Sequence, residues 1–196
     1  MNDNPVALLL IDIQRGLDFV DYYGGERNNP YAEENAGKIL HHWRSQDWPI
    51  YHIRHSSQHE DSPLHASLEG YEFKLETVPI PGEPIVTKDV NSCFIGTDLL
   101  DKLKQKRIQS LIMVGLTTNH CISSSARMAA NLGFDVTVIS DATAAFRQVG
   151  ADGTGFSAET VHQVSLANLS EEFAKVINTA ELIQQVSSNQ LTTILK

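Results

Sequence analysis

The sequence has no excess of basic residues: 15 Lys and Arg stand against 24 Asp and Glu, a formal net charge of -9. This charge disfavours binding to nucleic acid or to an anionic membrane surface, because both need a basic patch that neutralises phosphates. Long apolar runs are missing too. The run VALLLI ends at Asp12 and has no basic flank, so it predicts neither a signal peptide nor a membrane span. We therefore expect a cytoplasmic protein whose partner is a small molecule.

Cysteine is scarce as well. Cys93 and Cys121 form no CxxC pair and have no metal-like spacing, which favours reduced thiols over a disulfide framework. No G-x-G-x-x-G follows an early strand, since DIQRGLDF contains Gly16 alone, and a dinucleotide-binding domain is disfavoured. A phospho-acceptor signalling module is also disfavoured, because Lys88 stands where that class needs an aspartate. We expect no cofactor, and the absence of a linker-like stretch predicts a single domain over residues 1–196.

What is present is an alternation of β-branched apolar runs with stretches of helical period, which is typical of βα units around a parallel sheet. We predict strands at residues 6–12, 49–54, 84–88, 110–116, 134–140 and 173–177. Helices are predicted at residues 32–46, 98–106, 121–132, 157–169 and 180–187, with Thr97, Ser157 and Thr179 as N-caps. The predicted fold class is α/β, a doubly wound, mainly parallel six-stranded sheet with helices on both faces.

Residues 55–83 show no clear period and are rich in His, Ser, Pro and Glu, which is typical of a functional loop. Metal binding by this loop is disfavoured, because such side chains are common in solvated loops and their spacing fixes no coordination geometry. The side chains concerned are His55, His59, Glu60, Asp61 and His65. We expect no metal site there, and we expect His55, directly after its strand, to face the substrate.

Three reactive side chains fall at strand ends, where a doubly wound sheet binds its ligands. Asp12 closes the first strand, Lys88 closes the third, and Cys121 follows the fourth across the turn TTNH. Each alone has an ordinary structural explanation: a turn residue, a solvated cation and a small buried side chain. Together they suit thiol chemistry, because a helix N-terminus and an ammonium lower the pKa of a thiol while a carboxylate moves protons.

Four segments resemble the isochorismatase-like cysteine hydrolases, in the same order and at similar separations. They are LLLIDIQ, KDVNSCFIGTDL, VGLTTNHCISSSARMAANLGFDVTVISDATAA and SAETVHQVSLANLSEEFAKVINTAEL. The resemblance implies a catalytic triad of Asp12, Lys88 and Cys121, and a cis peptide bond between Leu116 and Thr117. It also implies the six-stranded α/β fold and a homodimer or homotetramer, for which the apolar segment at residues 191–195 is a candidate contact.

Differences within that family narrow the expected chemistry. Members that cleave the vinyl ether of isochorismate typically lack the cysteine, so the presence of Cys121 implies the amidohydrolase branch. Nicotinamidases have an Asp-x-His metal pattern after the second strand, where this sequence has Arg54 and Ser56. The expected reaction is cleavage of a C–N bond in a small amide or ureido compound through a thioester on Cys121. A thiol redox protein that uses the same cysteine and a vinyl-ether hydrolase are the alternatives.

The expected mechanism gives each group a role. Asp12 takes the thiol proton, Lys88 balances the charge, and the backbone N–H groups of Thr117 and Cys121 hold the oxyanion. His120 is expected to form part of the pocket wall or to have a structural role, and Cys93 is expected to have no catalytic role. The expected substrate pocket includes Phe19, Tyr22 or Tyr23, His55, Asn91 and Phe94, together with the loop at residues 55–83.

Overall fold

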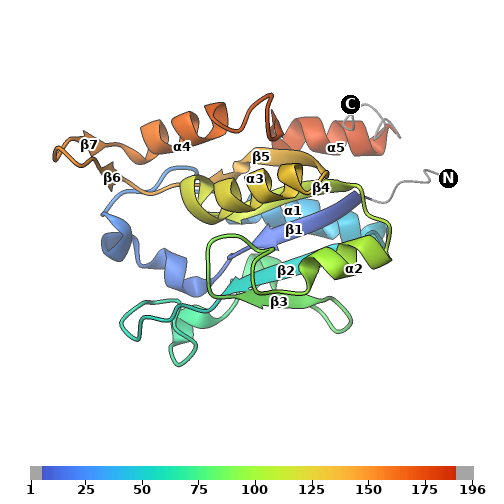
Figure 1. Cartoon of the computed structure of the whole chain (residues 1–196), viewed down its shortest axis with the longest axis horizontal. Coiled ribbons are helices and arrows are strands. Elements are labelled where there is room, and N and C mark those ends of the chain that lie inside the picture. The colour runs from blue at the N-terminus through green and yellow to red at the C-terminus, as the bar shows by residue number, and fades with distance from the viewer. Residues whose placement is uncertain (1–5, 189–196) are drawn as a thin grey trace.

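A computed structural model describes residues 6–188, so the candidate contact at residues 191–195 lies outside the described part. Six strands form one sheet in the order β3-β2-β1-β4-β5-β8, and every neighbouring pair is parallel. The strands are β1 (Val6–Ile11), β2 (Ile50–His55), β3 (Ile85–Lys88), β4 (Ser110–Leu116), β5 (Asp135–Ala144) and β8 (Lys175–Ile177). The predicted six-stranded parallel sheet is therefore confirmed (Figure 1).

Helices cover both faces of this sheet (Figure 1). α1 (Ala32–Ser45) and α5 (Thr179–Ser187) pack on one face, while α2 (Leu99–Gln105), α3 (Ser123–Asn131) and α4 (Ala158–Ala167) pack on the other. Both faces are covered, so alternate residues of β1 enter different cores: Leu8 and Leu10 face α1, whereas Leu9 and Ile11 face α2 and α3. This explains why the strand is a continuous apolar run. No helix within residues 6–188 has the length and apolar character of a membrane span.

The helix ends differ in part from the predicted ones. Ser157 caps α4 as predicted, accepting a hydrogen bond from the Thr160 N–H at 3.2 Å. Thr179 is not a cap: Asn178 caps α5 and forms a reciprocal capping box with Glu181. Asp98, not Thr97, stands at the N-cap of α2, and α3 is preceded by a π-helical turn over residues 118–122. A two-stranded hairpin of β6 (Gln148–Val149) and β7 (Gly155–Phe156) was not predicted.

Gly115 lies at a close approach of β4 to β1 near the site. Its φ is 121°, and a Cβ at this position would lie 2.0 Å from the carbonyl oxygen of Ile11. A shift in the pairing register of β4 with β5 falls at the same point. Because Ile11 precedes Asp12 and Gly115 precedes the turn to Cys121, this glycine sets the spacing of two strand ends that bear reactive groups.

Replacing Gly115 with alanine is expected to lower the free energy of unfolding by about 3 kcal/mol or more, because a backbone atom blocks the new methyl group and φ is unfavourable. Gly133 is the matched control: its φ is 90°, but nothing lies within 4 Å of an added Cβ. Gly133→Ala should cost about 1 kcal/mol. Denaturant unfolding curves measure both free energies of unfolding. Equal losses of stability in the two variants would show that the close approach of Gly115 to Ile11 does not matter.

Candidate active site

The three reactive side chains meet at the carboxyl ends of the strands. Asp12 follows β1 with a left-handed φ of 53°, which turns the chain out of the strand. Lys88 ends β3 and reaches past β2, so that its Nζ donates to Asp12 Oδ2 at 2.7 Å and to Cys121 Sγ at 3.4 Å. The side chains of Lys88 and Asp12 are only 0% and 2% exposed. The structure thus brings together the three residues that the sequence predicts as a site.

The Lys88 ammonium has a third acceptor in His55, at the end of β2. Nζ lies 3.0 Å from Nδ1 of His55, and an ammonium has three N–H donors, so each contact takes one proton. Burial alone would lower the pKa of Lys88, but the Asp12 carboxylate, through its charge and its hydrogen bond, holds that pKa above its ordinary value. Burial and the Lys88 charge lower the pKa of His55. His55 is therefore neutral, accepts at Nδ1 and has its proton on Nε2.

Gln14 fixes the position of His55 and was missed in the sequence. Its Oε1 accepts from the His55 N–H at 2.8 Å, and its Nε2 donates to the carbonyl oxygens of His55 at 3.0 Å and Tyr71 at 2.9 Å. The side chain is fully buried, so these bonds satisfy an amide that would otherwise be costly to bury. The available signal was a glutamine in an apolar context, two residues after the strand-end aspartate in LIDIQ.

Cys121 lies in the π-helical turn that leads into α3, and it is partly exposed. Burial and the Asp12 carboxylate raise the pKa of its thiol well above the ordinary value, and the opposing effect of Lys88 is smaller. The sequence-based expectation of a lowered pKa is wrong for this resting site, because burial and the nearby Asp12 carboxylate together outweigh Lys88. The resting site therefore contains a neutral thiol beside an Asp–Lys ion pair.

The carboxylate of Asp12 has one oxygen free to receive a proton. Oδ2 accepts from Lys88, whereas Oδ1 is buried and has no hydrogen-bond partner within residues 6–188. A carboxylate oxygen of Asp12 lies within 4.8 Å of both Cys121 Sγ and a His55 ring nitrogen. A buried, unpaired carboxylate oxygen is uncommon in folded proteins and is a strong acceptor. It is suited to remove the proton of the Cys121 thiol.

Asp12, His55 and Cys121 are also the one group of potential metal ligands that converges in the described chain. The Lys88 ammonium contacts all three at hydrogen-bonding distance, so a cation already occupies the space between these donors. A divalent metal ion at this point would be repelled by the ammonium. The donor set thus fits a lysine ammonium better than a metal ion, and the loop residues His59 and His65 do not join it.

A cavity of about 220 Å³ opens over Cys121. Tyr22, His55 and Asn91 line it as the sequence predicts, and so do Ser62 and Leu64 of the 55–83 loop. The wall also contains residues that sequence reasoning did not include in the pocket: Leu17, Leu116, Asn119, Phe146 and Gln148. Tyr23, Thr117 and His120 complete the wall. The peptide bond between Leu116 and Thr117 is cis, as the resemblance implies.

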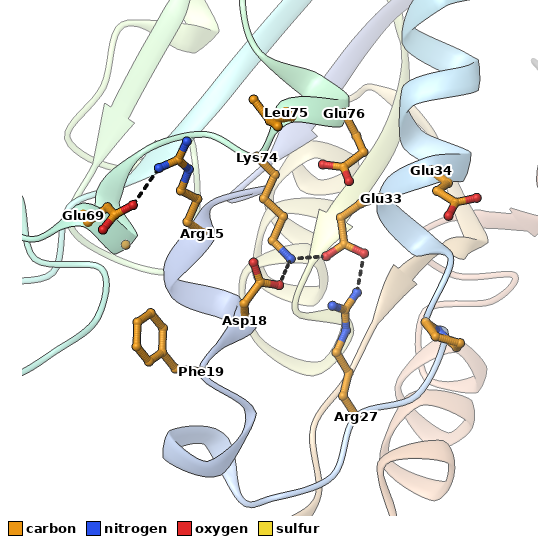
Figure 2. A pocket seen from close by; sticks show the side chains of 12 residues that line it. Arg15, Asp18, Phe19, Arg27, Glu33, Glu34, Glu69, Lys74, Leu75 and Glu76 are labelled. Carbon is orange, nitrogen blue, oxygen red and sulfur yellow. Dashed lines mark hydrogen bonds and ion pairs between the residues drawn. The ribbon is translucent and has the colours of Figure 1, made fainter.

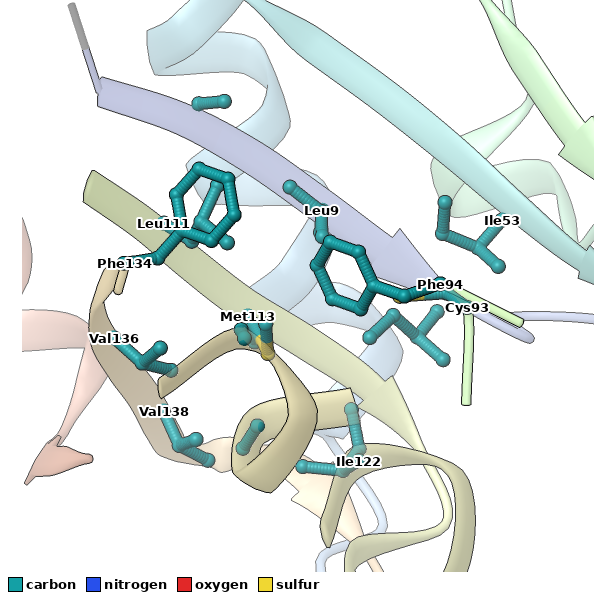
Figure 3. Close-up of a cluster of buried hydrophobic side chains, with 14 of the residues drawn as sticks. Leu9, Ile53, Cys93, Phe94, Leu111, Met113, Ile122, Phe134, Val136 and Val138 are labelled. Atoms are coloured by element: carbon teal, nitrogen blue, oxygen red, sulfur yellow. The ribbon is translucent and has the colours of Figure 1, made fainter. Parts of the chain in front are cut away.

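Two predicted pocket residues lie elsewhere. Phe94 is 9% exposed and packs in the core between the sheet and α2, with its ring centroid 6.1 Å from that of Phe134 (Figure 3). Phe19 is 57% exposed and lines a separate cavity. Both residues lie in irregular segments that follow a strand. Such segments have no regular period, so the sequence does not show which way their side chains point.

The separate cavity, of about 630 Å³, is larger and strongly charged (Figure 2). Lys74 bridges Asp18 at 2.6 Å and Glu33 at 2.5 Å, and Arg27 contacts Glu33 at 2.6 Å. Although burial opposes it, the ion pairs with Arg27 and Lys74 hold the pKa of Glu33 below its ordinary value. These bonds connect the chain after β1 with α1. The cavity wall contains no Cys, Ser or His, so we assign it a bracing role for the segment that bears Tyr22 and Tyr23.

The second cysteine is chemically inert in this setting. Cys93 is fully buried in the core, and burial raises the pKa of its thiol to about 12. Its backbone N–H donates to Ser125 Oγ at 3.1 Å, which ties the loop after β3 to α3. The structure therefore gives Cys93 a packing role and leaves Cys121 as the accessible thiol.

Comparisons with known proteins agree on one family. The family model described as Isochorismatase domain matches residues 6–181. The uncharacterized isochorismatase family protein YrdC of Bacillus subtilis is 46% identical over 177 residues, covering 90% of this chain and 94% of the relative. Ureidoacrylate amidohydrolase RutB of an Enterobacter species is 31% identical, covering 96% of this chain and 72% of the relative. A crystal structure from Chromobacterium violaceum, described as of the isochorismatase family, has a TM-score of 0.90 and 36% identity, covering 95% of each chain.

Proposed function

The chain belongs to the isochorismatase family of hydrolases, and from this premise we propose that it cleaves the C–N bond of a small amide or ureido compound through a thioester on Cys121. The observation that carries the proposal is the unpaired Oδ1 of Asp12 beside a neutral thiol, with Lys88 held between them. A base in this position can take the thiol proton as the sulfur attacks the carbonyl carbon.

The first half of the reaction forms the thioester. Asp12 takes the proton from Cys121 as Sγ bonds to the carbonyl carbon of the substrate, and the oxyanion that forms is expected to accept from the N–H groups of Thr117 and Cys121. The C–N bond then breaks, and the leaving nitrogen receives the proton from Asp12. Lys88 keeps its proton throughout and balances whichever of the two neighbours is negative.

The second half regenerates the thiol. Asp12, again a carboxylate, takes a proton from water as the water oxygen attacks the thioester carbon. The C–S bond breaks, and Cys121 leaves as a thiolate that Asp12 reprotonates while the acid product departs. One water is consumed, and the products are a carboxylic or carbamic acid and an amine or ammonia.

Two further observations favour amide hydrolysis over the alternatives. RutB, which is 31% identical, is named as an amidohydrolase, and this chain has the cysteine that a thioester mechanism needs. A redox role needs a thiolate at rest, whereas burial and Asp12 raise the pKa of Cys121. The cytoplasmic location and the homodimer or homotetramer stay predictions.

The test is a panel of small primary amides and ureides assayed for release of ammonia, with the Cys121→Ala protein as the background. We expect at least one compound to be hydrolysed by the wild type at a rate that the variant does not reach. A covalent adduct on Cys121, trapped by acid quench and found by mass spectrometry, would identify the thioester. Hydrolysis without such an adduct and with full activity in the variant would contradict the mechanism.

A further inference from the structure

The wall of the 220 Å³ cavity contains no lysine or arginine side chain within the described residues. Its one anionic member is Asp12, and that charge is already paired with Lys88, which lies beneath the cavity and is fully buried. The rest of the wall divides into apolar groups and neutral polar groups. The apolar ones are Leu17, Leu64, Leu116 and Phe146, and the neutral amides are Asn91, Asn119 and Gln148.

The two histidines of the wall add no positive charge. Burial lowers the pKa of both His55 and His120, and Lys88 lowers that of His55 further. The Lys88 ammonium has each of its three protons in a contact, with Asp12, His55 and Cys121. It has no free donor for an anionic group of the substrate.

Three arginines of the neighbouring segments are engaged elsewhere. Arg54 stacks over the ring of Tyr71, with its guanidinium carbon 4.2 Å from the ring centroid. Arg15 pairs with Glu69 at 2.9 Å, and Arg27 pairs with Glu33 at 2.6 Å on the wall of the other cavity (Figure 2). Each of these three cations has a partner outside the cavity over Cys121, and Arg147, which follows Phe146, is exposed and does not line this cavity.

The hydroxyl of Tyr23 indicates what the cavity recognises instead. It is buried and has no hydrogen-bond partner in the described chain, although Tyr23 lines the cavity and stacks on Phe146 with ring centroids 4.8 Å apart. Burial and the Asp12 charge raise its pKa, so it stays a neutral donor. Burying a hydroxyl without a hydrogen-bond partner costs free energy, and a bound acceptor would remove that cost.

We infer that the cavity selects an uncharged substrate, a small amide or urea whose remainder beyond the reacting carbonyl has no carboxylate or other ionised group. A carboxylate placed there would lose its hydration without gaining a cation, and it would lie near Asp12. The volume corresponds to about seven waters at roughly 30 Å³ each, which limits the substrate to a compact molecule. The inference rests on the proposed function and deepens it by naming the substrate class.

The experiment compares succinamide with succinamate, which have nearly the same shape and differ in the charge of the end remote from the reacting amide. After allowance for the two equivalent amides of succinamide, its kcat/KM is expected to be about 100-fold higher, the effect of leaving a buried charge unpaired. Comparable kcat/KM values for the two compounds would overturn the inference.

A second readout does not depend on turnover. Each compound is added to the wild type, and protection of Cys121 from alkylation by iodoacetamide is read by mass spectrometry. Protection by succinamide at concentrations where succinamate gives none supports charge selection even if neither compound is hydrolysed, a result that would count against the proposed function alone. Equal protection, or none by either compound, overturns the inference.

A variant with a positive charge in the cavity wall tests the same inference from the side of the protein. Gln148 lines the cavity, and Gln148→Arg should narrow the ratio of the two kcat/KM values by about 10-fold or more, because the new guanidinium can pair with the carboxylate. Val149 is 59% exposed and does not line the cavity, so Val149→Arg is the control that adds the same charge beside it. A ratio that changes equally in both variants would mean that overall charge, and not the wall, sets the preference.

Discussion

The Cys121→Ala protein is expected to fold normally and to lose hydrolysis by about 10⁵-fold, the scale seen when a catalytic nucleophile is removed. The loss is large because no other described thiol or hydroxyl takes the place of Sγ above Asp12 and Lys88. The effect on stability is small because Cys121 is partly exposed and its Sγ makes long hydrogen-bond contacts, at 3.4 Å to Lys88 and 3.9 Å to Asn91. Ammonia release and denaturant unfolding measure the two effects.

Cys93→Ala is the control for this prediction, and its expected effects are reversed. The Cys93 side chain is fully buried in the core between the sheet and α2 (Figure 3), so its removal should lower the free energy of unfolding by about 1 kcal/mol. Most of the hydrolysis should persist, because Cys93 is absent from the cavity wall. If the Cys121 variant kept wild-type turnover, the covalent mechanism would be wrong.

The convergence of Asp12, Lys88 and Cys121 could be predicted because it follows from topology. Parallel strands end at the same edge of a sheet, so reactive residues at several strand ends lie near one another whatever the loops do. The apolar runs predict the strands. At the ends of three of these strands stand Asp12, Lys88 and the turn before Cys121. Only the crossing of β2 by Lys88, which brings His55 into the cluster, depends on the observed strand order.

The pocket wall could not be predicted to the same degree, because loops have no period that fixes side-chain direction. Phe94 and Phe19 both follow strands, yet one packs in the core and the other is exposed. Gln148 comes from a two-residue strand whose pairing with β7 has no strong sequence signal. The direction of the pKa shift of Cys121 was also beyond the sequence, because it is set by the balance of distances to Asp12 and Lys88 and by burial.

Asp12→Asn is expected to have two opposite effects on the chemistry of Cys121. Hydrolysis should fall by about 10²- to 10⁴-fold, because the general base is lost. Alkylation of Cys121 by iodoacetamide at neutral pH should become faster. Burial and the Asp12 charge raise the pKa of the thiol, so removal of the charge lowers that pKa and increases the thiolate fraction, while Lys88 still favours the anion.

The measurement is a pH series of iodoacetamide labelling, read separately at Cys121 and Cys93 by mass spectrometry. In the wild type, Cys121 should label faster than the buried Cys93, and labelling should increase as the pH rises, because the thiol is neutral at rest. The Asp12→Asn profile should move to lower pH. Lys88→Met should move it to higher pH, because the ammonium opposes the effect of Asp12.

Asp89→Asn supplies the matched control, since it removes the same charge from an exposed residue next to Lys88. Exposed charges interact weakly through water, so both hydrolysis and labelling should stay close to the wild type. If Asp12→Asn slowed labelling as much as hydrolysis, Asp12 would be needed to hold the thiol in place and not to hold its proton. If labelling accelerates while hydrolysis falls, the more reactive thiol is the poorer catalyst, because it lacks the carboxylate that delivers a proton to the leaving nitrogen.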